Sequence, residues 1–377
     1  MSWRRTRAMM HKEFLHIVRD KRSLAMALAV PLLMLMLFGY ALTLDVDRIP
    51  TLVYDSDHTP ESRELVSRFE GSRYFQVLGA VDDYRAIERE IDRDRCLLGL
   101  VIPRYYAREL LAGRRPQVQL IFDGSDSNTA SIARGYANAV LQAYSASVRS
   151  RAMDRRAGAK LDLPIDGRLR VLYNSELKSR NYIVPGLIAV ILAIIASLIT
   201  SLTIAREWET GTMEQLLSTP LRPAELVLGK MLAFFALGFV DTLVSIAVGV
   251  FVFRVPLRGS PMLLIAASSL FLIGTLCWGI LISAIARSQV LAYQMGMLTS
   301  FLPAFLLSGF VYAIANMPVV IQVISHVVPA RYFVTVLKGV FLKGIGLEIL
   351  WGEIAFLLAF AAMVFFFATR KLRQKVA

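Results

Sequence analysis

Long apolar runs, separated by short polar stretches, make up most of the second half of the sequence, and one more lies near its start. The runs occupy residues 23–44, 181–205, 225–253, 261–286 and 349–369. Each is long enough as a helix to cross the roughly 30 Å hydrocarbon core of a bilayer. The run at 23–44 is too long for a typical signal-peptide core and lacks a convincing cleavage site, so we interpret it as an uncleaved first span.

The apolar stretch 288–345 is harder to divide, because three prolines and a glycine interrupt it. These are Pro303, Gly309, Pro318 and Pro329. Two full crossings here would give seven spans and place the two ends of the chain on opposite sides. We therefore predict one crossing at 288–308, followed by a re-entrant or outer-interface segment at 309–345. Irregular backbone at membrane depth must pack against protein or line a cavity.

Residues 45–180 differ from the rest of the chain because they are polar and alternate between strand and helix patterns. Strand patterns fall at 51–54, 74–81, 97–102 and 118–122, and helix patterns at 60–69, 82–95, 104–112 and 127–151. Strands that alternate with helices are typical of a compact α/β domain. The sequence thus predicts an α-helical membrane protein with six spans and an α/β domain inserted between spans one and two.

Basic residues gather at both ends of the chain. They are Arg4, Arg5, Arg7, Lys12, Arg19, Lys21 and Arg22 before the first span, and Arg370, Lys371, Arg373 and Lys375 in the tail 370–377. The positive-inside rule therefore places both ends in the cytoplasm and the domain 45–180 outside. The same clusters account for the net charge of +13 without a nucleic-acid partner. The 56% hydrophobic content and mean hydropathy of +0.54 indicate a membrane protein.

The basic stretch 1–22 carries apolar residues on one predicted helical face. Trp3, Met10, Phe14 and Ile17 recur at spacings of seven, four and three. We interpret the stretch as an amphipathic helix that lies in the inner interface and contacts lipid. A merely solvated basic tail is the alternative. Cys96 and Cys277 are the only cysteines, one in a soluble and one in an apolar region, so no disulfide is expected.

The polar stretch 206–224, between the second and third spans, is a loop at the cytoplasmic face. Thr212 followed by Gln215 fits a capping box at the start of a short helix, and Pro220 ends that helix. Acidic residues outnumber basic ones here, so anionic lipid heads would repel this surface, and a protein partner suits it better. An ordinary capped turn between two membrane helices is the alternative.

The run EWETGTMEQLLSTPLRPAELVLGK, residues 207–230, resembles the cytoplasmic loop of ABC-2-type transporter permeases of the exporter branch with a large extracytoplasmic domain. The stretch YNSELKSR, which ends at Arg180, and residues 306–344 resemble the same family. The resemblance implies a coupling helix that docks on a separate ATP-hydrolysing subunit, and a dimer with a second permease copy or a paralogue. The implied contact residues are Glu207, Trp208, Glu209, Gly211, Thr212, Met213, Glu214, Gln215 and Leu216.

Asp241 lies near the middle of the third span, and an ionisable group at that depth suggests a function by default. It is a candidate for the substrate pathway, and a packing role through hydrogen bonds to a neighbour such as Thr242 or Ser245 is the alternative. Glu353 lies near the outer end of the last span, where an interfacial position explains it. For His326, Arg331 and Lys338 at the outer mouth, snorkelling or local pairing is favoured over attraction of anionic substrate.

Catalytic and metal chemistry find no support in the sequence. Gly229 and Lys230 do not form a phosphate-binding loop, because the earlier glycine is missing and Met231 replaces the required Ser or Thr. His11 and His16 lack ligand companions, and a turn with a helix cap explains Asp123, Asp126 and Asn128. The chain therefore binds no cofactor of its own, and ATP with Mg²⁺ belongs to the partner.

The resulting hypothesis is the permease subunit of an ATP-driven exporter of amphiphilic or drug-like substrates in the bacterial inner membrane. A periplasmic adaptor for the outer domain is part of this hypothesis. An exporter of lipid or polysaccharide is one alternative, although such relatives usually lack so large an outer domain. A proton-coupled secondary transporter is another, but it needs several buried carboxylates or a relay. A receptor or scaffold survives only if no ATPase copurifies.

Overall fold

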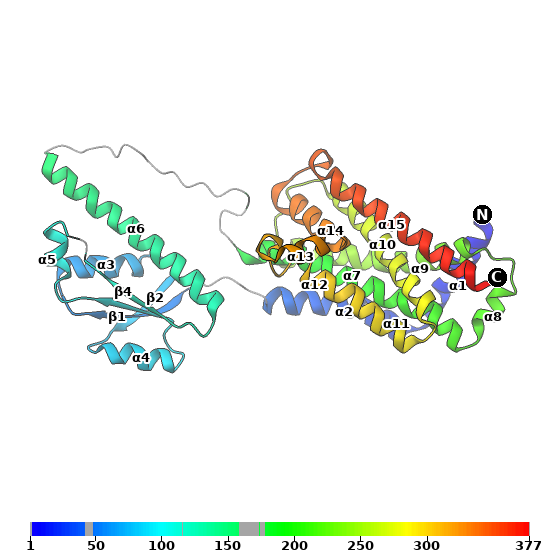
Figure 1. Ribbon diagram of the computed structural model, residues 1–377, viewed down its shortest axis with the longest axis horizontal. Helices are drawn as coiled ribbons and strands as arrows, with labels where there is room; N and C mark the ends of the chain where they lie inside the picture. The colour runs from blue at the N-terminus through cyan, green and yellow to red at the C-terminus, as the bar shows by residue number, and fades with distance from the viewer. Residues whose placement is uncertain (1, 42–47, 115, 158–172, 174–177, 377) are drawn as a thin grey trace. The chain divides into compact units, whose positions relative to one another are not determined.

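The computed structural model describes residues 2–41, 48–114, 116–157, 173 and 178–376. The chain forms two compact units, one made of Met1–Thr43 with Val171–Ala377 and the other of Leu44–Arg170 (Figure 1). We call them the helical unit and the α/β unit. The outer end of the first predicted span and half of the YNSELKSR stretch lie outside the described residues.

The α/β unit contains a four-stranded sheet with the strand order β2-β1-β3-β4. Its strands are β1 (Ile49–Asp55), β2 (Phe75–Ala80), β3 (Leu98–Ile102) and β4 (Gln119–Phe122). β1 pairs in parallel with both β2 and β3, and β4 runs antiparallel to β3. Each strand starts within two residues of the position predicted from the polarity pattern, and the α/β class is correct.

Helices cover both faces of this sheet. They are α3 (Pro60–Glu70), α4 (Tyr84–Asp92), α5 (Tyr106–Leu111) and α6 (Ser127–Ala157). Successive side chains of a strand point to opposite faces. Val53 of β1 therefore packs in the cluster with α3, α5 and α6, while its neighbour Leu52 packs against Ile87 of α4 (Figure 1). The unit thus has a core on each side of its sheet.

The helical unit contains α1 (Trp3–Arg19), α2 (Lys21–Ala41), α7 (Ser179–Glu209), α8 (Thr212–Leu217), α9 (Pro223–Ala247), α10 (Pro261–Ala286), α11 (Gln289–Gly296), α12 (Leu302–Leu306), α13 (Val319–Ser325), α14 (Pro329–Lys338) and α15 (Leu347–Val376). π-helical turns extend α9 (Val248–Val252) and α14 (Gly339–Lys343) and join α11 to α12 (Met297–Phe301), and a 3₁₀ turn covers Ile314–Asn316. Among the described residues, five helices are long and apolar enough to cross a membrane: Leu24–Ala41, Ser179–Glu209, Pro223–Val252, Pro261–Ala286 and Leu347–Leu372. They coincide with the five apolar runs of the sequence.

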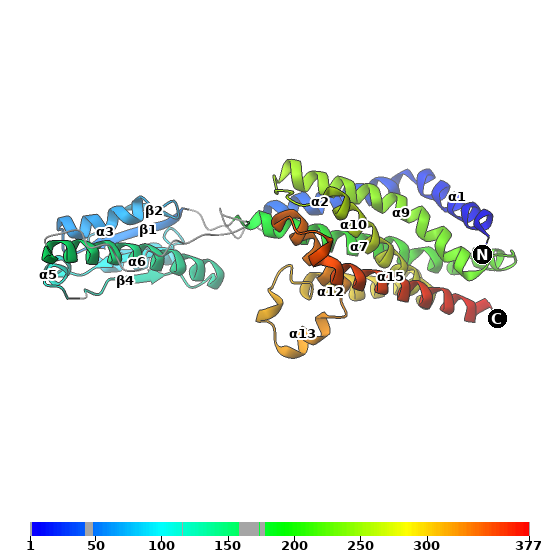
Figure 2. The same ribbon diagram turned by 90° about the horizontal axis from the view of Figure 1, so that it is seen from above.

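α7 is the central helix of this unit, and α2, α9, α10, α11 and α14 pack against it (Figure 2). Every side chain from Ile183 to Ile194 is buried. This stretch is apolar on all sides, as suits a helix that is surrounded by other helices. α10 approaches α7 so closely that a Cβ added at Gly279 would overlap the Thr200 hydroxyl and the Ser197 carbonyl oxygen.

The continuous helix formed by α11, its π-helical turn and α12 runs antiparallel to α7 over almost the whole of α7. At one end, Gln289 Nε2 donates to Glu209 Oε2 at 2.5 Å. Midway, Ser300 Oγ donates to Ser197 Oγ at 2.6 Å. Beyond the other end, Tyr182 Oη donates to the carbonyl oxygen of Gly309 at 2.8 Å. This helix coincides with the predicted span 288–308. It is not among the five helices that are long and apolar enough to cross a membrane.

The segment 309–345 leaves and returns at the same end of the helical unit. Lys338 Nζ donates to the carbonyl oxygen of Gly309 at 3.0 Å, so both ends of the segment meet there. α13 and the extended α14 meet at a bend of 84°. Arg258 and Gly259, between α9 and α10, donate backbone hydrogen bonds to Phe341 and Val340 at the same place. A re-entrant or interfacial course for this segment, rather than a crossing, stays our prediction.

Candidate functional site

The chain turns between α7 and α9 through the short helix α8. α7 continues to Glu209, so the first residues of the predicted loop 206–224 form its last turn. Gly211 then adopts the left-handed conformation (φ 72°), which glycine tolerates without strain, and α8 begins at Thr212. The predicted capping box is therefore wrong. The position before the helix has no side chain, and the Thr212 hydroxyl contacts Thr210 Oγ1 at 3.0 Å instead.

The predicted partner-contact residues divide into outward and inward groups. Glu209, Gly211, Thr212, Glu214 and Gln215 are exposed, and Trp208 and Leu216 are half-buried. Glu207 and Met213 are buried inside the helical unit. The Met213 side chain is 1% exposed and packs in a cluster with Met9 of α1 and Met231 of α9. α8 is therefore anchored through Met213, while Glu214 and Gln215 face outward. The partner contact itself stays a prediction.

Four charged side chains from three helices form a network in which three members are buried and Lys12 is half-exposed. Lys230 of α9, only 1% exposed, lies 3.0 Å from a carboxylate oxygen of Glu13 on α1 and 3.0 Å from one of Glu207 on α7. Lys12 of α1 contacts the same two carboxylates at 3.0 and 2.9 Å. Two lysines thus balance two glutamates, as buried charges require. The network, which we call the charge quartet, links α1 to the ends of both helices that flank α8.

The opposite charges shift the titration of the two quartet members on α1. Burial alone would raise the pKa of Glu13, but Lys230 and Lys12 outweigh this effect and hold it below its ordinary value. Burial alone would lower the pKa of Lys12. The hydrogen bond to Glu207 and the charges of both carboxylates outweigh that effect, so the pKa of Lys12 lies above its ordinary value. Both groups are therefore charged at neutral pH.

α1 turns its polar and small residues toward the protein. Its buried residues are Thr6, Met9 and Glu13, whereas Trp3 is 64% and Phe14 45% exposed. Trp3 and Phe14 of the predicted apolar face thus point away from the helical unit, which suits contact with lipid, whereas Ile17 of the same face packs against the core. Close approach to α9 is possible because a Cβ at Gly229 would come within 2.6 Å of the Met9 Cβ.

The start of α1 is tied to the start of α9 by a second buried acid. Glu225 is fully buried, and its carboxylate accepts hydrogen bonds from the backbone nitrogens of Ser2 (2.6 Å) and Arg222 (3.0 Å). The Arg5 guanidinium lies 3.5 Å from the same carboxylate and also donates to the Pro220 carbonyl oxygen. α1 therefore holds the end of the α8 loop as well as the charge quartet.

A cavity of about 750 Å³ opens beside the charge quartet, which is within the usual size range for small-molecule sites. We call it the inner cavity. Its polar lining comes from Lys12, Glu13, His16, Asp20, Arg206, Glu207, Thr210, Thr212, Gln215 and Lys230. Its apolar lining comes from Ile17, Leu24, Ala27, Ile199, Leu202, Leu216, Phe234 and Leu237. The cavity is therefore amphipathic, with charges of both signs at one end and an apolar wall at the other.

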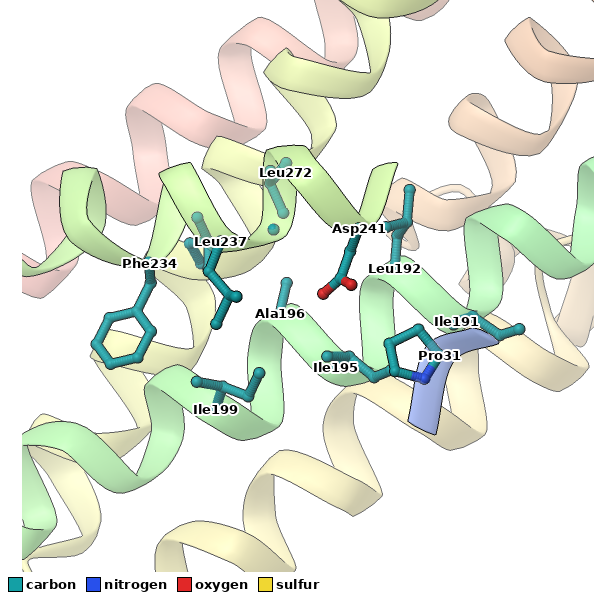
Figure 3. Close-up of a pocket in the computed structure, with 12 residues that line it drawn as sticks. Pro31, Ile191, Leu192, Ile195, Ala196, Ile199, Phe234, Leu237, Asp241 and Leu272 are labelled. Carbon is teal, nitrogen blue, oxygen red and sulfur yellow. The ribbon is translucent and has the colours of Figure 1, made fainter. Parts of the chain in front are cut away.

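Asp241 of α9 is buried among apolar side chains, and its carboxylate points into the space near Leu192, Ile195 and Ala196 (Figure 3). The residue is 4% exposed, and its Oδ2 has no hydrogen-bond partner. Of the hydrogen bonds expected for a packing role, the one to Thr242 is not formed, because the Thr242 hydroxyl donates to the Gly238 carbonyl oxygen at 2.7 Å.

Local pairing accounts for two of the cations near Gly309. Lys338 Nζ lies 3.4 Å from the centre of the Tyr182 ring, in addition to its bond to Gly309. Arg331 donates to the Ser325 hydroxyl at 2.6 Å. In the α/β unit, the Asp123 carboxylate accepts from the Ser125 backbone nitrogen, as in a turn, while the side chain of Asn128 lies outside the described residues. Within the ranges that the structure describes, no three His, Cys, Asp or Glu residues gather as metal ligands.

The sequence interpretation missed Glu13, Lys12 and Lys230 as a unit. Two signals were present: Glu13 is the only acidic residue among the first nineteen, and Lys230 is a charge inside an apolar run. Their pairing joins residues 217 positions apart, which no local pattern reveals.

Comparison with known proteins gives consistent matches along the chain. Residues 21–370 match the family model described as "ABC-2 family transporter protein". The chain is 36% identical to the probable multidrug ABC transporter permease YbhS of Escherichia coli (strain K12), over 96% of this chain and 95% of that protein. It is 30% identical to the probable multidrug ABC transporter permease YbhR of the same organism, over 98% of each chain. It is 27% identical to the inner membrane transport permease YhhJ, also of that organism, over 87% of this chain and 86% of the other.

Proposed function

The chain belongs to the ABC-2 family of transporter proteins, and from that premise we propose that it is the permease subunit of an exporter driven by a separate ATPase. The substrates are amphiphilic or drug-like molecules, in line with the names of the multidrug permeases YbhS and YbhR. The ATPase subunit holds the ATP and Mg²⁺. A second copy of this chain, or a paralogue, completes the pathway in the inner membrane.

The observation that carries the proposal is the way α8 is mounted. Its outward side presents Glu214 and Gln215, and its inward side is fixed by Met213. The charge quartet then joins α1 to the adjoining ends of α7 and α9. A displacement of α8 by a docked ATPase therefore reaches two spans directly, because packed interiors transmit strain. This is the mechanical arrangement that a permease without its own nucleotide site requires.

Charge reversal at Glu214 is expected to uncouple the ATPase. Glu214→Lys reverses an exposed charge on α8 without touching the charge quartet, whereas a Glu207 variant would disturb the fold as well. If Glu214 faces a cation of the partner, the new lysine repels that cation, and like charges across an interface cost several kcal/mol. Substrate-stimulated ATP hydrolysis by the purified complex is then expected to fall by about tenfold or more. The measurement is vanadate-sensitive phosphate release in nanodiscs, together with the amount of ATPase that copurifies.

The matched control is Glu348→Lys, the same change at an exposed residue in the first turn of α15. It is expected to leave hydrolysis and copurification unchanged. The docking role of α8 is refuted if both variants behave alike. The exporter function is refuted if no ATPase copurifies with the wild-type chain from its native membranes.

We further propose that both termini and α8 face the cytoplasm and that the α/β unit faces the periplasm, where an adaptor protein receives the substrate. Single-cysteine labelling tests the two sides, because the native Cys96 and Cys277 are 3% and 0% exposed. A membrane-impermeant maleimide is expected to label Gly135→Cys of α6 in intact spheroplasts. Ser218→Cys, just after α8, is expected to react only after permeabilisation. The opposite pattern would invert the topology and remove α8 from any cytoplasmic ATPase.

A further inference from the structure

The surroundings of Asp241 suggest a specific kind of ligand. The small cavity that its carboxylate enters is lined by α2, α7, α9 and α10, and every other lining residue is apolar or glycine (Figure 3). Oδ2 is buried and unpartnered. A carboxylate in such surroundings has given up water without gaining a protein donor, so a cation that reaches it gains a strong, weakly screened electrostatic interaction.

This small cavity adjoins the inner cavity. Ile199, Phe234 and Leu237 line both, so these side chains form a shared wall between the two spaces. Lys230, Phe234, Leu237 and Asp241 fall on one face of α9, at spacings of four, three and four. Asp241 therefore lies about 16 Å along the helix from Lys230, at 1.5 Å per residue. Phe234 and Leu237 therefore stand between the inner cavity and Asp241, and a ligand that reaches Asp241 from the inner cavity must displace them.

The chemistry of the lining changes along the two cavities in an order that suits one class of ligand. The cytoplasmic end carries three cations and three carboxylates besides His16, so it selects neither sign of charge. The middle is apolar, and the far end holds the single carboxylate of Asp241. The inner cavity alone has room for a drug-sized body. A molecule with a large apolar body and one positive charge can therefore pack against the apolar wall and place its charge beside the unpaired oxygen of Asp241.

We propose that Asp241 and the apolar wall of the inner cavity form the export site for lipophilic monocations, with Asp241 as counter-ion to the ligand's positive charge. This inference rests on the proposed exporter function and specifies its substrate class. Phe234 and Leu237 lie at the junction, where they contact the apolar body. The ligand reaches the site from the cytoplasmic side of the membrane, past the charge quartet.

Two probes with the same shape and opposite charge test the proposal, namely tetraphenylphosphonium and tetraphenylborate. Equilibrium binding is measured with radiolabelled probes on the full chain, together with its copurified ATPase, in nanodiscs of fixed composition. The wild-type complex is expected to bind the cation saturably above the empty-nanodisc background and to show no saturable binding of the anion. Asp241→Asn is expected to weaken cation binding by about thirtyfold or more, equivalent to about 2 kcal/mol, as for truncation of a buried charge pair.

Three further variants separate the ligand contact from a structural role. Asp241→Glu keeps the charge and is expected to restore most of the binding. Leu237→Trp narrows the junction while Asp241 stays intact, and it is expected to weaken cation binding. Glu353→Gln, in α15 away from the cavity, is the matched control and is expected to bind as the wild type does. Asp241→Asn is also expected to melt at or above the wild-type temperature, because it removes an unpaired buried charge.

The proposal is overturned if Asp241→Asn or Leu237→Trp binds the cation as the wild type does, or if the borate anion binds as tightly as the cation. Loss of binding in Asp241→Asn without recovery in Asp241→Glu, combined with a lower melting temperature, would assign Asp241 to the fold and also overturn it. Copurification of the ATPase is scored in the same samples. A negative binding result with the ATPase present refutes only this substrate class, whereas absence of the ATPase refutes the exporter function.

Discussion

Lys230→Met is expected to lower the free energy of unfolding by about 3–5 kcal/mol, as is typical when one partner of a buried ion pair is removed. The change leaves Glu13 and Glu207 with only Lys12 to balance them, and Lys12 is half-exposed. Both carboxylates are at least nine-tenths buried, so water does not replace the lost ammonium. The expected result is a large fall in the melting temperature in detergent, measured by tryptophan fluorescence. A lower yield of folded protein in the membrane is also expected.

Two variants make this prediction specific. Lys343→Met is the same substitution at an exposed lysine of the helical unit and is expected to change stability by less than about 0.5 kcal/mol. The double variant Glu13→Gln with Lys230→Met removes one charge of each sign and is expected to be more stable than the sum of the single changes allows. Additive effects, or a normal melting temperature for Lys230→Met, would show that the charge quartet does not stabilise the fold.

Gly279→Ala is expected to destabilise the helical unit by about 1–3 kcal/mol, the range for overpacking of a tight interface. The added methyl group would overlap the Thr200 hydroxyl and the Ser197 carbonyl oxygen, so α10 must move away from α7. That movement stretches the polar contacts between the two helices. Ser283 Oγ accepts hydrogen bonds from the backbone nitrogens of Ile204 and Ala205, both at 2.9 Å. Small residues at helix interfaces in membranes serve this close approach.

Gly352→Ala is the matched control for this prediction. Gly352 lies in α15, and a Cβ there would meet no atom within 4 Å. Because alanine favours helix over glycine, this variant is expected to melt at or slightly above the wild-type temperature. Equal effects of the two alanines on the melting temperature would mean that the contact between α7 and α10 does not limit stability.

The helices and strands could be predicted from the sequence wherever the pattern of polar and apolar residues is uniform along the whole element. Apolar runs about as long as the bilayer is thick mark the five candidate spans, and short strand patterns that alternate with helix patterns mark the four strands of the sheet. The sixth predicted crossing, at 288–308, gives a weaker signal. Its helix contains Gln289, Gln294 and Ser300, which reduce its hydropathy, and it depends on α7 for polar partners such as Ser197 and Glu209. The prediction that this helix crosses the membrane therefore rests on the parity of the basic ends and not on hydropathy.

The candidate site was only partly predictable. The position of α8 follows from the polarity and turn residues of its loop, and Asp241 stands out by its charge. The prediction of a capping box was wrong because the N-cap position of α8 is Gly211, in the left-handed conformation. The pattern of Thr212 with Gln215 carries no information about that backbone conformation. Which side of α1 faces the protein was also hidden, because close packing of Thr6 and Met9 on Gly229 decides it, and Trp3 and Phe14 of the apolar stripe are exposed.

The dependence of α11 and α12 on α7 has a consequence for biosynthesis. The chain emerges from the ribosome with α7 roughly eighty residues ahead of this helix. A segment with several amides and hydroxyls partitions poorly into lipid by itself, but it enters readily beside a partner that accepts its hydrogen bonds. The order of synthesis thus places α7, which accepts these hydrogen bonds, in the bilayer first. A permuted gene that encodes α11 before α7 is expected to insert this segment poorly.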